Sequence, residues 1–273
     1  MGNRSCSGPN STYHGPWPVF VLAGGLIGAA ALAVSCAALT APSATNPSVS
    51  THSPTAATRY PLHTGIIATT FWVGEIFDPN AADGSQVYST YDAQWEAHYG
   101  GCDGVTTDGS CRTERRTAAN GYFPTAMSPR QNPFYLDLPF DDINNNAAFR
   151  QRGQVIPWAH QPPYAGNVDH RSVSLMKNRW VELRRGGRVC YGQIEDAGPG
   201  EYDDAGYVFG TGNARPANTR YNGAGLDVSP ALNGCLAFTE LDGDDDQVDW
   251  RFVDAADVPD GPWMKIVTTS GAS

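Results

Sequence analysis

The sequence is poor in charged residues, and in positive charge above all. Only 17% of its 273 residues are charged, and 18 Lys and Arg stand against 28 Asp and Glu, which gives a net charge of −10. No basic stripe stands out, so the phosphate neutralisation that drives nucleic-acid binding has no source here. An acidic surface also disfavours docking on anionic lipid head groups. We therefore expect no nucleic-acid partner, whereas a neutral sugar polymer fits the charge.

The sequence also lacks the spacings that hold metal ions, and it has no internal repeat. No CxxC pair and no Cys/His spacing indicates a zinc site. The acidic run at 241–249 alternates like a calcium loop, but Gln247 stands where such a loop needs Gly and Val253 stands where it needs Glu. The run is therefore interpreted as a solvated turn, and we predict neither a metal nor a cofactor.

Cysteine is present in a pattern typical of exported proteins. Of six cysteines, Cys6 and Cys36 lie near the N-terminus, and the other four are Cys102, Cys111, Cys190 and Cys235. An even number in the folded part is typical of a secreted domain with two disulfides, although four free thiols are the alternative. Cys102 and Cys111 flank a short Gly/Asp/Thr loop and are expected to pair. Cys190 and Cys235 then pair by elimination.

An uncharged segment near the N-terminus predicts export. Residues 19–39 (VFVLAGGLIGAAALAVSCAAL) approach the ~20 residues that a membrane-spanning helix needs. The same run can be the core of a signal peptide, and LAVSC resembles a lipoprotein cleavage box ending at Cys36. All three interpretations place the rest of the chain outside the cytoplasm, secreted or anchored, and we expect contact with a membrane only through this segment.

Composition divides the chain into three parts. Residues 1–39 form the leader, and residues 40–62 form a linker rich in Ser, Thr, Pro and Ala that cannot bury a core. Residues 63–273 are expected to fold as one domain. The whole chain contains 30 Gly and 20 Pro, and this composition favours turns and short strands over long helices.

Hydrophobic patterns predict an all-β fold. Strands are expected at 66–73, 132–138, 206–209, 248–253 and 263–268, and a hairpin is expected at 180–196, where Gly186-Gly187 provides the tight turn. One amphipathic helix is expected across 88–99, where aromatic residues recur at helical spacing. Many short strands with little helix indicate a closed barrel or a sandwich.

Two stretches carry a carboxylate at a strand end beside Gly or Pro. They are IEDAGP at 194–199, which contains Asp196, and GAGLDVSP at 223–230, which contains Asp227. Turns of this kind let a ligand approach the backbone closely. The structural alternative is that each Asp bonds its own turn, and either Asp227 or Ser229 is expected to cap a short helix that follows.

Together these stretches resemble the double-psi β-barrel proteins, which include rare lipoprotein A, expansins and endoglucanase V-like enzymes. The family has a strand that ends in an Asp-x-Gly-Pro turn, followed by an Asp-Leu-Ser or Asp-Val-Ser motif that opens a helix. Three further pieces match in order: TTFWVG at 69–74, TAANG at 117–121 and LPF at 138–140. The resemblance spans roughly residues 66–235. It implies a six-stranded double-psi barrel with short helices and long loop insertions.

The resemblance assigns roles residue by residue. Asp196 matches the acid of the Asp-x-Gly-Pro turn, and Asp227 matches the key acid of the expansin and endoglucanase motif. Where lytic transglycosylases of the rare lipoprotein A type have a Glu and a His, this chain has Tyr122 and Tyr135. The position of the second catalytic Asp of the endoglucanases is occupied by Val73 in this chain. Glu75, two residues later, can substitute for that Asp if the loop brings its side chain to the same place.

These matches predict a protein that acts on a polysaccharide such as peptidoglycan or a cellulose-like glycan. Cleavage needs a protonated acid, for which Asp227 is the first candidate, with Asp196 as its partner. Glu75 is expected to contact substrate, and Trp72, Tyr122, Tyr135 and Tyr207 are candidate stacking platforms for sugar rings, with barrel core as the alternative. The rival functions are a non-catalytic, expansin-like carbohydrate-binding module and a structural or inhibitor-like domain without clustered acids.

Overall fold

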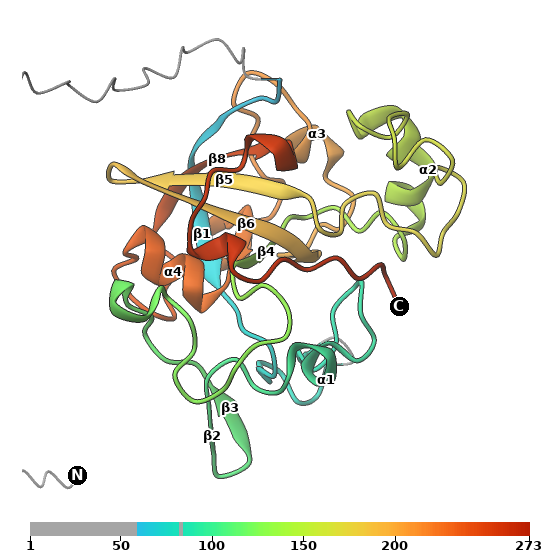
Figure 1. Cartoon of the computed structure of the whole chain (residues 1–273). Coiled ribbons are helices and arrows are strands. Elements are labelled where there is room, and N and C mark those ends of the chain that lie inside the picture. The colour runs from blue at the N-terminus through green and yellow to red at the C-terminus, as the bar shows by residue number, and fades with distance from the viewer. Residues whose placement is uncertain (1–58, 82–83) are drawn as a thin grey trace, which may run out of the picture. The chain divides into compact units, whose positions relative to one another are not determined.

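The computed structural model of the chain describes residues 59–81 and 84–273, and Figure 1 shows their arrangement. The predicted leader at 1–39 and the predicted linker up to residue 58 lie outside the described residues. Among the first described residues, Tyr60 is already buried in the core and donates its hydroxyl to Asp254 Oδ1 at 2.8 Å. The described fold therefore extends a few residues ahead of the predicted start at 63.

Six strands close into a mixed β-barrel, which confirms the predicted fold class. Their order around the barrel is β1-β7-β4-β6-β5-β8, and β8 pairs with β1 to close it. The strands are β1 His63–Thr70, β4 Tyr135–Asp137, β5 Trp180–Arg185, β6 Arg188–Asp196, β7 Leu226–Val228 and β8 Gln247–Val253. The pairs β1/β7 and β4/β6 are parallel, and the other four are antiparallel. This topology is compatible with a double-psi barrel.

The predicted hairpin at 180–196 is confirmed as β5 and β6. The strands pair from Arg185↔Arg188 to Trp180↔Gln193. Gly186 and Gly187 form the turn with φ angles of 54° and 79°, which both lie in the left-handed region that glycine adopts without a steric cost. The hairpin carries β6 to its last residue, Asp196, at the end of the barrel where the acids gather.

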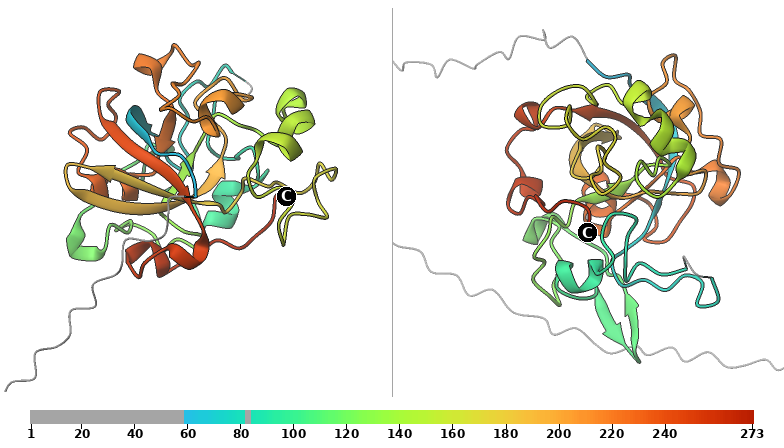
Figure 2. Two further views of the ribbon diagram at one scale, coloured as in Figure 1. Left: turned by 90° about the horizontal axis from the view of Figure 1, so that it is seen from above. Right: turned by 90° about the vertical axis from the view of Figure 1, so that its right-hand side faces the viewer.

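The remaining elements decorate the barrel (Figure 2). The short strands β2 Val105–Thr107 and β3 Ser110–Arg112 form a separate hairpin that projects away from the barrel in both figures. The helices are α1 Trp95–Tyr99, α2 Asn146–Val155, α3 Ala205–Val208 and α4 Pro230–Leu236, with 3-10 turns η1 Ala118–Asn120, η2 Tyr221–Gly223, η3 Ala255–Asp257 and η4 Pro262–Met264. These segments fill the long loop insertions between the strands.

Three sequence-based expectations about these elements are wrong. The helix expected across 88–99 is confined to Trp95–Tyr99, because the backbone before it makes other bonds, such as that from Thr90 N–H to Asp196 Oδ1 at 2.7 Å. Residues 205–208 form helix α3 rather than a strand, because Asp204 accepts a hydrogen bond from Tyr207 N–H at 3.1 Å and caps it. No strand forms at 263–268, where Thr268 pairs instead with the Gln193 side chain.

Both predicted disulfides are present. Cys102 pairs with Cys111, and Cys190 pairs with Cys235, with Cα–Cα distances of 5.6 and 6.3 Å. The first closes the loop that carries β2 and β3, and the second ties β6 to α4. Disulfides persist in oxidising compartments, so the pairs indicate an environment outside the cytoplasm. Within the part of the chain that the structure describes, no helix has the length and apolar character to cross a bilayer.

Candidate functional site

Three aspartates meet where β4, β6 and β7 lie side by side. Asp137 is the last residue of β4, Asp196 is the last residue of β6, and Asp227 is the middle residue of β7. In the barrel β4 lies between the other two strands. Asp137 pairs in register with Asp196, and its neighbour Leu136 pairs with Val228. The two motif aspartates therefore belong to one site, with a third aspartate between them.

Asp227 is the member of this group that solvent still reaches, since the residue is only half-buried. Its backbone N–H donates to Asp137 Oδ1 at 2.8 Å, and its own Oδ1 accepts a hydrogen bond from the hydroxyl group of Thr69. Thr69 faces it across the parallel β1/β7 pair. The helix cap that the sequence left open is Ser229, whose hydroxyl accepts from Leu232 N–H at 3.3 Å. Asp227 is thus free of a capping role.

Asp196 is buried, with 5% of the residue exposed. Its Oδ1 accepts hydrogen bonds from the backbone N–H groups of Thr90 at 2.7 Å and Ala197 at 2.8 Å. The turn that follows requires glycine: a Cβ on Gly198 would come within 2.5 Å of Asp137 Oδ2. The Asp-x-Gly-Pro turn is therefore seated directly against the Asp137 carboxyl group.

Burial sets the proton affinity of all three groups. It raises the pKa of Asp196 to about 7, although the two backbone N–H donors favour the ionised form. Burial also raises the pKa of Asp227 to about 6, although the hydrogen bond from the Thr69 hydroxyl stabilises the ionised form and lowers this pKa. The pKa of Asp137 lies well above its usual value, because of burial first and then the charges of Asp227 and Asp196. All three carboxyl groups therefore hold protons in a range where ordinary aspartates do not.

Glu75 is the fourth acid of the site. It is half-buried in the loop after β1, where Gln86 N–H donates to its carbonyl oxygen at 2.8 Å. Burial raises the pKa of Glu75 to about 8; the Trp72 N–H opposes this rise, and the charges of Asp242 and Asp227 add to it. Val73, at the position of the family's second acid, is fully buried. The loop thus brings Glu75 into electrostatic contact with Asp227.

A buried network fixes the chain just before Glu75. The Tyr135 hydroxyl accepts from Val73 N–H at 3.1 Å and donates to Asp103 Oδ2 at 2.7 Å. Asp103 also forms a 2.7 Å ion pair with Arg116, and its backbone N–H donates to Val73 O at 2.9 Å. These contacts lock the segment that leads into Glu75 onto the loop closed by the Cys102–Cys111 disulfide.

The predicted stacking platforms lie in or against the core. Tyr135 and Tyr207 are 0% and 1% exposed, and Tyr207 accepts a hydrogen bond from Trp250 Nε1 at 2.8 Å. Trp72 is buried as well and donates its indole N–H to Cys111 O at 3.2 Å. Tyr122 is half-buried and packs edge-on against Phe134. These positions match the core alternative, and neither Tyr135 nor Tyr207 presents a ring face to solvent.

Other aromatic residues are exposed on the loops that carry the acids. Phe77, two residues after Glu75, is 51% exposed, and Tyr221, on the η2 turn before Asp227, is 54% exposed. The sequence offered no signal for them, because they follow no strand or helix pattern. Asp137 did leave a signal that sequence reasoning passed over: it is the single charged residue in the apolar run NPFYLDL.

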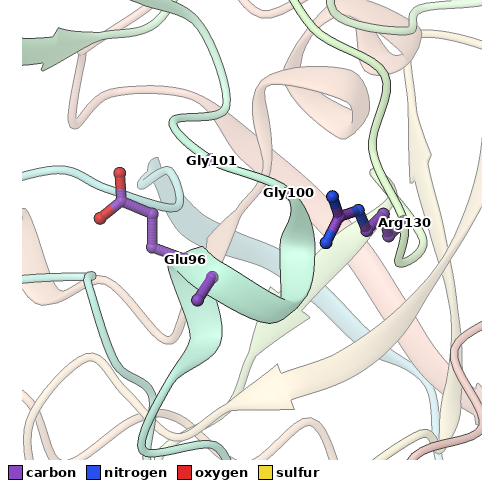
Figure 3. A pocket seen from close by; sticks show the side chains of 5 residues that line it. Glu96, Gly100, Gly101 and Arg130 are labelled. Carbon is purple, nitrogen blue, oxygen red and sulfur yellow. The ribbon is translucent and has the colours of Figure 1, made fainter.

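The pocket in Figure 3 is separate from these acids. It measures about 380 Å³ and is lined by Glu96, Ala97, Gly100, Gly101 and Arg130 around the end of α1. The Glu96 and Arg130 side chains lie on opposite sides of the helix in this view. Across residues 59–81 and 84–273, no three His, Cys, Asp or Glu side chains are grouped so as to hold a metal ion.

Comparison of the chain with protein-family models, with curated proteins and with solved structures gives no match.

Proposed function

We propose that this protein is an extracytoplasmic glycan-cleaving protein of the double-psi barrel type, with Asp227 and Glu75 as its reacting carboxyl groups. The observation that carries the proposal is the pairing of two half-buried acids whose pKa values, about 6 and about 8, lie on either side of neutral. Two carboxyl groups held in different protonation states are what glycoside hydrolysis requires. The closed barrel, the two disulfides and the motif order support the family assignment.

The proton affinities suggest a division of roles. Near neutral pH, Glu75 keeps its proton and is suited to protonate the leaving oxygen of a glycosidic bond. Asp227 is then largely ionised and is suited to activate water or to attack the sugar itself. This reverses the role that the sequence alone suggested for Asp227, which becomes a proton donor only below about pH 6. Asp196, being buried, is better placed to orient the turn than to touch substrate.

The positions of Tyr122 and Tyr135 favour hydrolysis over lytic transglycosylation. In transglycosylases that resemble this chain, the matching positions carry a Glu and a His. Here Tyr135 is fully buried beside Asp103, and Tyr122 packs on Phe134. Neither position provides a group that protonates a sugar, so the two-carboxylate chemistry of the endoglucanase type is the one supported.

The test is release of soluble sugar from peptidoglycan and from cellulose by the full chain. We expect Glu75→Gln and Asp227→Asn each to lower release at least a hundredfold, because each removes a titrating proton while it keeps the shape of the side chain. Asp260→Asn, in an exposed loop, is the matched control and should leave release unchanged. Equal activity of wild type and the two site variants would remove these residues from the mechanism.

A non-catalytic carbohydrate-binding module is the second candidate. The exposed rings of Phe77 and Tyr221 favour it, since sugar faces stack on aromatic rings without any chemistry. In that case the wild type sediments with an insoluble glycan but releases nothing from it. If the chain neither binds nor cleaves any glycan offered, the polysaccharide function is wrong, and the barrel remains.

A further inference from the structure

We infer that Asp137 is a positioning residue of this site, and that its buried carboxyl group joins the Asp227 strand and the Asp196 turn into one rigid unit. The sequence motifs of the family assign no role to this position. The inference rests on the proposed function only for the purpose of the site. The contacts by which Asp137 joins the two segments do not depend on that function. Four observations carry it.

The first observation is the hydrogen bond to the Asp227 backbone. Strand β7 has only three residues, and it pairs with β4 at the single position Leu136↔Val228. On its other side all three residues of β7 pair with β1, so the β4 side is the less extensively paired of its two edges. Beyond this pairing, Ser229 N–H donates to Tyr135 O at 2.9 Å, and the Asp137 Oδ1 atom accepts the Asp227 N–H at 2.8 Å as a side-chain attachment between the two strands. It therefore holds the main chain of the very residue that we propose to react.

The second observation is the contact with the turn after Asp196. Asp137 pairs in register with Asp196. Its Oδ2 atom lies against Gly198, so close that a Cβ atom on that residue would be only 2.5 Å from it. The Gly198 N–H donates to Leu138 O at 3.2 Å, next to Asp137 in the chain. One carboxyl group therefore touches both motifs, through one oxygen atom each.

The third observation is the burial of this carboxyl group among other acids. Asp137 is 2% exposed, and the titratable groups that act on it or feel its charge are Asp227 on β7, Asp196 on β6 and Tyr207 on α3. A third negative charge beside two others is costly in a buried place. Burial and these neighbours raise the pKa of Asp137 well above its usual value.

The fourth observation is the absence of spare room around it. Leu136 packs against Gly192 of β6, where a Cβ would come within 2.8 Å of Leu136 Cδ2 and of Leu232 Cδ1. The strand that carries Asp137 is thus held between its neighbours on both sides. This packing holds the β4 backbone, and with it the Asp137 backbone, in place beside Asp227.

The test compares two substitutions. Asn keeps the size of Asp137 and an oxygen that accepts from Asp227 N–H, whereas Ala keeps neither. We expect Asp137→Asn to retain glycan release within about threefold at pH 7, and Asp137→Ala to lose tenfold or more in kcat with little change in KM. Rescue by Asn but not by Ala indicates positioning. Loss of release in both variants, with both still folded, would overturn the inference.

A second measurement does not depend on activity. In the full chain labelled with ¹⁵N-aspartate, the Asp227 amide resonance should follow two titrations in the wild type, that of its own carboxyl group and that of Asp137, whose pKa lies well above the usual value. The titration from Asp137 should vanish in Asp137→Asn. If the amide follows a single titration that Asp137→Asn leaves unchanged, Asp137 does not hold this N–H. If the wild type releases no sugar but the two titrations appear, the proposed function falls and the role of Asp137 stands.

Discussion

At the scale of single residues, the proton affinity of Asp227 depends on two opposing contacts. Burial raises its pKa to about 6, and the Thr69 hydroxyl lowers it by donating to Oδ1. Thr69 faces outward from β1, half-buried, beside the one aspartate that solvent reaches. The Thr69 hydroxyl group thus contributes to the pH at which Asp227 ionises.

We therefore predict that Thr69→Val raises the pKa of Asp227 further, by roughly 1 unit, because the lost hydrogen bond favours the ionised form. Valine keeps the branched shape and the strand preference of threonine. Carboxyl ¹³C NMR titration measures the effect, and Thr106→Val on the exposed strand β2 is the control. An Asp227 midpoint that stays in place or falls would show that the hydroxyl does not stabilise its charge.

The site could be predicted in part because two of its residues lie in local motifs. Asp196 and Asp227 each stand beside Gly and Pro in a recognisable turn, and such turns are written in a few consecutive residues. Asp137 stands in no turn, and its role arises only when β4 inserts between β6 and β7. Glu75 was reachable as a substitute for a missing acid, but its link to Asp227 depends on how the loop at 72–86 folds. Pairing across strands is not visible in local sequence.

At the scale of elements, too, structure encoded in consecutive residues is predictable from the sequence, and structure that depends on distant contacts is not. The β5–β6 hairpin was predictable because both strands and the Gly-Gly turn are contiguous. Residues 206–209 have the composition of a strand, yet Asp204 caps a helix there, and the segment packs Tyr207 against Trp250. Tertiary contacts override a weak local preference in so short a segment.

The two disulfides brace different elements, and we predict different consequences of removing them. Loop closure of 45 residues by Cys190–Cys235 is worth roughly 4 kcal/mol, and closure of 9 residues by Cys102–Cys111 is worth roughly 2.5 kcal/mol. Replacing each pair by Ala should therefore cost more global stability at Cys190 and Cys235, measured by urea denaturation.

The smaller disulfide should matter more to function. The loop that Cys102–Cys111 closes holds the chain before Glu75, through Trp72 Nε1 to Cys111 O at 3.2 Å and Asp103 N–H to Val73 O at 2.9 Å. We expect its removal to lower glycan release more than removal of the larger disulfide does, when both variants are assayed well below their unfolding midpoints. The reverse order would mean that the loop does not position Glu75.

At the scale of the whole molecule, buried acids dominate the dependence of stability on pH. The pKa values of Asp196, Glu195 and Glu75 are raised by burial to about 7, 8 and 8, so the folded state keeps protons that the unfolded chain has already released. Stability from these groups is complete below their unfolded pKa values and is lost as pH rises. For Asp196, a rise from 3.8 to about 7 corresponds to on the order of 4 kcal/mol.

His63 acts in the opposite direction. It is buried and stacked on Trp250, and burial lowers its pKa, so its contribution is present above the unfolded value of 6.5 and is lost as pH falls. Acids whose pKa values are lowered also oppose the buried acids, but their contribution is lost only as pH falls below their ordinary values; they are Asp92, Glu114, Glu182 and Asp254. We therefore predict a stability maximum at about pH 4 and a decline toward pH 8. Urea midpoints at constant ionic strength measure it, and Asp196→Asn should flatten the decline. Stability that rises from pH 5 to pH 8 would contradict the assignment.

The way in which the barrel closes has a consequence for the order of folding. The first strand, β1, finds its two neighbours only at the far end of the chain: Thr69 meets Asp227, and Ile66 meets Val248. An N-terminal segment that emerges first from a ribosome or a translocation channel therefore waits, with its apolar face uncovered, until almost the whole chain has followed. Pairings so distant in sequence form slowly and leave aggregation-prone intermediates. Folding of this chain should thus benefit from a holding chaperone that protects β1 until β7 and β8 arrive.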